Sequence, residues 1–68
     1  MTMSAADLQR LIDSLDDMIK RNRRYLEGAL NAHQINNVAL VRARIIELTD
    51  QKKYFESRLK ELINEKHH

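Results

Sequence analysis

The sequence predicts an all-α chain that folds as an antiparallel two-helix hairpin, similar to a short coiled coil. Its 68 residues include no proline and a single glycine, so the commonest helix breakers are almost absent. Apolar residues recur at alternating spacings of three and four in both halves of the chain, which is typical of one helix face packed on another. The two apolar stripes also mirror each other about one point, which indicates that the helices run in opposite directions.

The first helix is expected over residues 5–32, directly after Ser4. Ser4 and Asp7 have the spacing of a capping box, in which the serine oxygen accepts a free backbone N–H. The apolar residues that follow occupy heptad positions a, d and e, and Asn22 interrupts the a column. They are Leu8, Leu11, Ile12, Leu15, Met18, Ile19, Tyr25, Leu26, Ala29 and Ala32.

The second helix is expected over residues 37–65, after a turn over residues 33–36. Asn36 or Asn37 is the predicted cap, because an asparagine side chain can accept a free N–H at a helix start. The stripe of this helix is interrupted by one lysine. It reads Val38, Val41, Ile45, Leu48, Lys52, Phe55, Leu59 and Leu62.

The register follows from the numbering, since facing residues of an antiparallel hairpin have position numbers with a constant sum. Eight pairs, from Leu8 with Leu62 to Ala32 with Val38, share the sum 70. In this register Gly28 lies inside the first helix, where glycine costs about 1 kcal/mol relative to alanine. A competing interpretation ends that helix at Gly28 as a left-handed cap and leaves the last apolar residues of the second helix without partners.

Two polar residues fall within the expected core, Asn22 and Lys52. In one interpretation Lys52 extends its ammonium group toward solvent and toward Asp16 or Asp17, while Asn22 finds a backbone or water partner. In the other, the two residues fix the register or the oligomeric state, as a buried asparagine in a coiled coil can. Both interpretations stay open at this point.

Length and composition favour one small domain over residues 1–66, and a chain this short is expected to be only marginally stable alone. His67 and His68 are interpreted as the remnant of a purification tag. The absence of cysteine fits a reducing compartment, and no apolar run is long enough for a membrane span. We therefore expect a cytoplasmic protein, and the net charge of +2 is too small to require a polyanionic partner.

The residue pattern does not indicate an enzyme. Two of the aspartates stand four residues before a basic residue, Asp16 before Lys20 and Asp17 before Arg21. This spacing is typical of a solvated helix face. The internal His33 lies near a helix end and has no cysteine or second internal histidine beside it in the sequence. No phosphate loop, nucleophile elbow or zinc-helix motif is present. We expect no catalytic residue, cofactor, metal or small-molecule substrate.

The most informative feature is apolar surface beyond what a two-helix seam requires. Ile12, Ile19 and Leu26 stand at heptad position e, outside the expected seam, which favours contact with a further helix. Other large apolar residues fall outside the seam around the turn and along the second helix. The predicted protein interface comprises Ile12, Ile19, Leu26, Leu30, Ile35, Leu40, Ile46 and Tyr54.

A basic segment offers a second type of contact. Its residues are Lys20, Arg21, Arg23 and Arg24, with Arg42 and Arg44 expected across the hairpin. Such a belt could contact the phosphates of a nucleic acid. The interpretation is weakened by nearby acidic residues and by the lack of interleaved aromatic side chains.

These features predict a protein-binding module, either an adaptor, regulator or cochaperone that packs on another protein, or a homodimeric four-helix bundle. The nucleic-acid alternative is such a bundle that uses the basic belt. In size and layout the chain resembles the small helical hairpins of type III secretion needle-subunit cochaperones and of the plasmid copy-number regulator that dimerises into a bundle. The resemblance covers the hairpin layout only and assigns a role to no residue.

Overall fold

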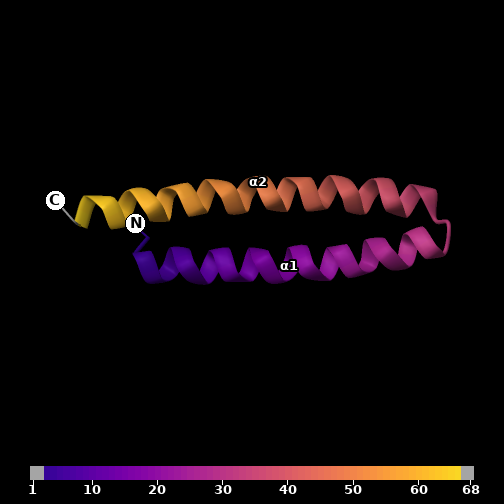
Figure 1. Cartoon of the computed structure of the whole chain (residues 1–68), viewed down its shortest axis with the longest axis horizontal. Coiled ribbons are helices and arrows are strands. Elements are labelled where there is room, and N and C mark those ends of the chain that lie inside the picture. Colours follow the sequence, from indigo (N-terminus) through magenta and orange to yellow (C-terminus); the bar gives the residue numbers. More distant parts are fainter. Residues whose placement is uncertain (1–2, 67–68) are drawn as a thin grey trace.

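The computed structural model describes residues 3–66, which form two long antiparallel helices joined by a tight turn (Figure 1). Helix α1 spans Ala5–Asn31 and helix α2 spans Ile35–Lys66. The two helices lie side by side, and both chain ends are at the same end of an elongated molecule of 53 × 20 × 14 Å. The helical hairpin is therefore confirmed, while His67 and His68 lie outside the described residues.

The start of α1 has the predicted capping box. The backbone N–H of Asp7 donates to the Ser4 hydroxyl oxygen at 3.2 Å, and the Ser4 N–H donates to the Asp7 carboxylate at 3.4 Å. The carboxylate also lies in the positive first turn of the helix, where a negative charge is stabilising. The start of α1 is thus determined by these two side chains.

The end of α1 is a Schellman turn with histidine at the position that usually holds glycine. The N–H of Gln34 donates to the carbonyl of Ala29 at 3.0 Å, and the N–H of His33 donates to the carbonyl of Leu30 at 3.2 Å. His33 has a φ of 56°, in the left-handed region. Gly28 lies within the helix and has no positive φ, so the competing interpretation that made it the left-handed cap is wrong.

Helix α2 begins earlier than the sequence indicated, because Ile35 lies within the segment expected to form the turn. The N–H of Val38 donates to the carbonyl of Gln34 at 2.9 Å, which places Gln34 at the start of the helix. Asn36 and Asn37 lie in the first helical turn, so neither is the predicted cap. The Asn37 side-chain amide donates instead to the Gln34 side-chain oxygen at 2.8 Å.

The core is a single seam between the two helices. Leu15, Ile19 and Leu48 form its central cluster, against which Leu11, Met18 and Phe55 pack as half-buried residues. The remaining buried positions extend this seam toward both ends of the hairpin. The seven buried hydrophobic residues are Leu8, Ile12, Leu15, Ile19, Ala29, Val41 and Leu48.

The hairpin closes on a different edge of the α1 stripe from the one predicted. Ile12 and Ile19 are 6% and 4% exposed, so the prediction that they lie outside the two-helix seam is wrong. Tyr25, which was expected inside the seam, is 56% exposed. A rotation of α1 accounts for both differences, because it turns the column of Ile12 and Ile19 into the seam and moves the column that ends at Tyr25 to the edge of the seam.

Candidate interaction surface

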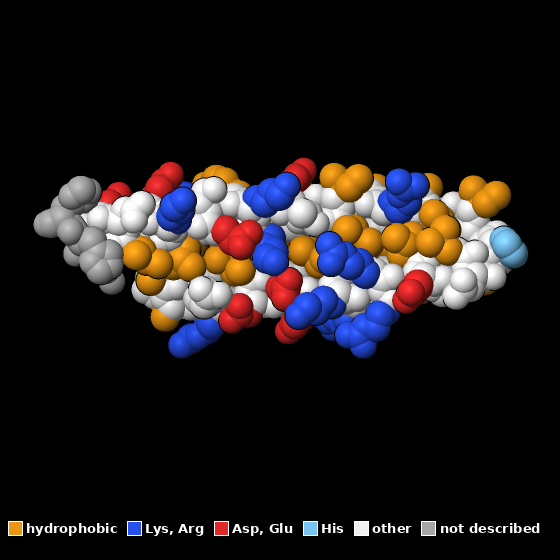
Figure 2. Space-filling model, in the orientation of Figure 1, with side chains coloured by type: hydrophobic (Ala, Val, Ile, Leu, Met, Phe, Trp, Pro, Cys, Tyr) orange, Lys and Arg blue, Asp and Glu red, His pale blue; other side chains and the backbone are white. Residues whose placement is uncertain are grey.

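The seam has two flanks, and one of them is charged. Lys52 donates to Asp16 Oδ1 at 2.9 Å across the hairpin, and the Lys20 ammonium lies 3.0 Å from Asp16 Oδ2. We refer to the side of the hairpin that carries these three residues as the charged flank. Figure 2 shows acidic and basic side chains interrupting the apolar seam at the middle of this face.

The contacts of the charged flank shift the pKa values of Asp16 and Lys52. Hydrogen bonds from Lys52 and then Lys20 lower the pKa of the Asp16 carboxyl below its ordinary value of 3.8. The hydrogen bond with Asp16 raises the pKa of the Lys52 ammonium above 10.5. Asn22, the other polar residue of the predicted core, donates its side-chain amide to the Met18 carbonyl at 2.7 Å. The local partners expected for both polar residues are thus confirmed.

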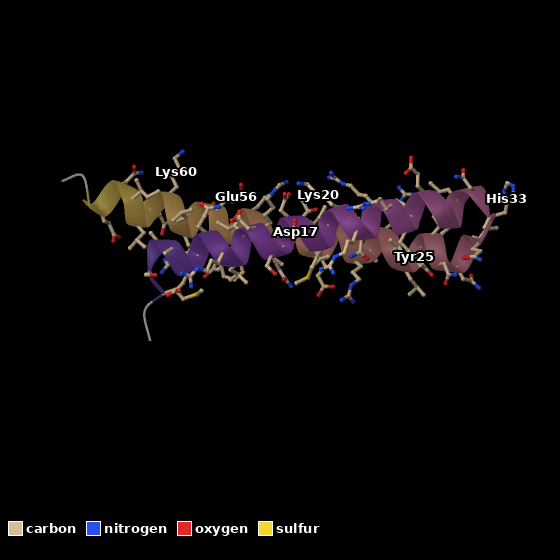
Figure 3. The ribbon with its side chains drawn as sticks, turned by 90° about the horizontal axis from the view of Figure 1, so that it is seen from below. Asp17, Lys20, Tyr25, His33, Glu56 and Lys60 are labelled. Atoms are coloured by element: carbon tan, nitrogen blue, oxygen red, sulfur yellow. The ribbon has the colours of Figure 1, made fainter. Side chains whose placement is uncertain are left out.

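The opposite side of the hairpin carries a column of apolar side chains on α1. Leu11, Met18 and Tyr25 are spaced seven residues apart, so they lie above one another along one edge of the helix. Met18 is two residues from Asp16, which places it about 160° around the helix from the charged flank. Figure 3 shows Tyr25 pointing to the opposite side from Lys20. We refer to Leu11, Met18 and Tyr25 as the apolar flank.

A second group of exposed apolar side chains lies on the outer side of α2 and at the turn. Ile35 and Ile46 share one line along the helix, and Leu40 and Tyr54 share another about 100° around it. We refer to these four residues as the outer α2 surface, and each is more than half exposed, with Ile35 reaching 80%. Figure 2 shows apolar side chains along the α2 edge toward the turn.

The predicted interface residues are therefore only partly brought together. Leu30 and Ile35 line one shallow groove at the turn, together with His33 and Val38. Leu30 thus adjoins the outer α2 surface. Leu26 is half-buried on the seam side of α1, where Ile12 and Ile19 are buried, so these three do not join the exposed group.

The apolar flank was missed in the sequence, although one signal was available. The two candidate columns on α1 differ in chemistry, since one is aliphatic throughout and the other contains Tyr25. A tyrosine hydroxyl needs a hydrogen-bond partner when it is buried, whereas at a flank it can remain in water. This difference favours the aliphatic column for the seam and leaves Leu11 and Met18 half-exposed beside Tyr25.

The basic residues do not form one continuous patch. Arg42 and Arg44 are two residues apart on α2, so they point about 160° apart around the helix axis. Arg23 lies close enough to Lys52 to act on its charge, on the charged flank. Arg21 and Arg24 line a hollow with Asp17 on the outer side of α1. Within residues 3–66, the five arginines of the predicted belt form no ion pair.

The aspartates weighed in the sequence do not gather into one group with His33. Asp16 is held by two lysines, and Asp17 lies on the solvent side of α1, as Figure 3 shows. His33 is exposed at the turn, at the far end of the hairpin from the chain ends. In the described part of the chain, no three His, Cys, Asp or Glu side chains come together as a group that could hold a metal ion.

None of the helices within residues 3–66 is both long enough and apolar enough to cross a membrane. Comparisons with protein-family models, with curated proteins and with solved structures found no match to this chain.

Proposed function

We propose that this chain is a small, non-catalytic protein–protein interaction module that acts as an adaptor, regulator or cochaperone. The observation that carries the proposal is the amount of surface left exposed. The chain exposes 5596 Å². A compact monomer of the same mass, 8.0 kDa, would expose about 4,500 Å² by the usual scaling of area with mass. The excess, roughly 1,100 Å², exceeds the ~800 Å² that each partner buries in a standard protein interface.

The thin core supports the same proposal. No side chain in the described residues is fully buried, and the seven buried hydrophobic residues form a single row between two helices. A pair of helices that uses only one seam has no second layer to cover its remaining apolar side chains. Packing against two further helices would supply that layer and complete a four-helix bundle. The two further helices would come either from a second copy or from another protein.

Binding to another protein should depend on the outer α2 surface. In affinity capture from the native cell extract, wild-type chain and the variant Ile46→Asp are compared at equal concentration, with Arg24→Glu as a charge-changing control on α1. We expect a stoichiometric protein to be retained by wild type and by Arg24→Glu and to be lost with Ile46→Asp. Retention by Ile46→Asp and loss with Arg24→Glu would contradict the apolar interaction and favour the basic residues.

Nucleic-acid binding by a homodimeric bundle is the second candidate function. It is favoured by the five arginines of the belt that form no ion pair within the described residues. It is weakened by their distribution around the hairpin, since Arg42 and Arg44 point in different directions. A test is RNA and DNA binding measured between 50 and 200 mM salt, because phosphate contacts lose affinity by about 10³–10⁵ over this range when six to ten are made. Binding that is absent at low salt would exclude this candidate.

A further inference from the structure

We infer that the apolar flank of α1 binds a second copy of this chain in an antiparallel arrangement, with Met18 of both copies at the two-fold axis. In this arrangement Leu11 of each copy packs on Tyr25 of the other. The inference rests on the proposed association through exposed apolar side chains. It adds the identity of one partner, the surface used and the register of the contact.

The spacing of the apolar flank makes it self-complementary. Leu11 and Tyr25 lie seven residues before and after Met18, so a two-fold axis through Met18 exchanges their positions. Leu11 and Met18 are half-buried and Tyr25 is 56% exposed, so all three have apolar surface left for a partner. Each Tyr25 ring would cover a Leu11 side chain, and its hydroxyl would remain at the edge of the contact, where it can reach water.

Charge decides between the antiparallel and the parallel arrangement. Asp13 and Asp17 come before Met18 in the sequence and lie toward the open end of the hairpin. Arg21 and Arg24 come after Met18 and lie toward the turn. These four residues form no ion pair within the described part of the chain. Of these, Arg21 and Asp17 lie nearest to Met18 around the helix, and an axis at Met18 places residue 21 of one copy at the level of residue 15 of the other, two residues from Asp17. A parallel arrangement would instead bring the arginines of the two copies together, and like charges that close are destabilising.

The charge of the two halves of the hairpin favours the same orientation. Residues 19–50, which form the turn half, contain six basic and three acidic residues. Residues 3–18 and 51–66, which form the open half, contain six basic and seven acidic residues. The antiparallel dimer places the positive turn half of each copy against the slightly negative open half of the other. Complementary charge of this kind selects orientation more than it adds affinity.

Molar mass tests the existence of the dimer and the face that it uses. By light scattering on the full chain, wild type is expected to have twice the mass of the monomer. Tyr25→Asp should have the monomer mass and keep its helical circular dichroism, since Tyr25 is exposed in the hairpin. Ile46→Asp is the matched control, because Ile46 is a similarly exposed residue of the outer α2 surface, and it should remain dimeric.

Disulfide formation tests the register, and it is simplified because the chain contains no cysteine. A chain with Met18→Cys should form a covalent dimer under mild oxidation, because the two introduced thiols meet at the axis. Leu11→Cys or Tyr25→Cys alone should form little covalent dimer. An equimolar mixture of the two single variants should give the crosslinked pair. Crosslinking of Tyr25→Cys with itself, to the extent seen for Met18→Cys, would indicate a parallel dimer and contradict the inference.

The molar-mass and capture experiments can fail independently, so their results distinguish the dimer from the proposed function. A wild-type chain that is monomeric at all concentrations overturns the inference. The proposed function would still stand in that case if the capture experiment retained a protein through Ile46. A dimer that persists in Tyr25→Asp but is lost in Ile46→Asp also overturns the inference, because association would then use the outer α2 surface.

Discussion

The left-handed backbone of His33 is the clearest local cost in the described chain. With a φ of 56° it occupies a region in which residues other than glycine lose about 1–2 kcal/mol. His33→Gly removes this cost but gives the unfolded chain more freedom, so we expect the free energy of unfolding to rise by about 0.5–1 kcal/mol. His33→Val should lower it, because a branched side chain is disfavoured at positive φ. Urea unfolding of both variants measures the difference, and a destabilised His33→Gly would contradict the turn described here.

The ion pair between Asp16 and Lys52 predicts a dependence of stability on pH. Because folding lowers the pKa of the Asp16 carboxyl, its stabilising contribution is complete above about pH 4 and is lost as the pH falls through the lowered value. Because folding raises the pKa of the Lys52 ammonium, its contribution is complete below about pH 10.4 and is lost as the pH rises through the raised value.

The measurement is the free energy of unfolding of wild type and Asp16→Asn from pH 2 to pH 7. We expect Asp16→Asn to be less stable than wild type at neutral pH, and the difference should shrink as the medium becomes acidic. Asp17→Asn is the matched control, since Asp17 is the neighbouring carboxylate and forms no ion pair in the described residues. If Asp17→Asn reproduced the effect, the ion pair with Lys52 would not be its cause.

Within helix α1, Gly28 weakens an otherwise continuous stretch. Apart from the two chain neighbours and the backbone of the same helix, no atom lies within 4 Å of the position that a Cβ would take at Gly28, so a methyl group can be added without a clash. We expect Gly28→Ala to raise the free energy of unfolding by about 0.5–1 kcal/mol, because alanine loses less backbone freedom on folding. Thermal unfolding followed by circular dichroism measures the change. A loss of stability would instead favour a left-handed glycine at this position.

Much of the two helices could be predicted from the sequence, because the signals for them are local. The capping box at Ser4 and Asp7 depends on residues three apart, and it forms as expected. The apolar periodicity similarly predicted the long helices and their opposite directions. The start of α2 was less predictable, because both Gln34 and the asparagines after it are polar and the choice depends on the geometry of the turn.

The choice of seam on α1 could not be settled by periodicity alone. Leu8 and Leu15 belong to the seam in either case, but the helix also has an apolar column on each side of them. Both columns have the spacing of a helix face that packs on α2. The sum of the position numbers of facing residues does not distinguish them either, because it changes little when α1 rotates about its axis. Three-dimensional packing decides the choice, and it buries Ile12 and Ile19 while leaving Tyr25 exposed. Periodicity therefore did not identify the exposed column or the candidate site, and the signal for it in the sequence was the tyrosine at position 25.

At the scale of the whole molecule, the shape of the hairpin explains why a partner matters. Its radius of gyration is 15.5 Å, whereas a compact domain of the same length would have about 11 Å. An elongated two-helix molecule therefore leaves more of each helix in contact with water than a compact domain does. Association along the helices is the most direct way to reduce this exposure, because it covers surface along the whole length of the molecule at once.

We expect the thermal stability of the chain to depend on protein concentration. If folding and dimerisation are coupled, each tenfold increase in concentration contributes about 1.4 kcal/mol to the stability of the dimer. For two chains of 68 residues, the usual entropy of unfolding converts this into a rise in Tm of about 5 °C per tenfold increase. Calorimetry of wild type from 5 to 500 μM measures it. Tyr25→Asp should have a lower Tm that does not change with concentration, and a wild-type Tm that is equally constant would show that the hairpin is stable without its second copy.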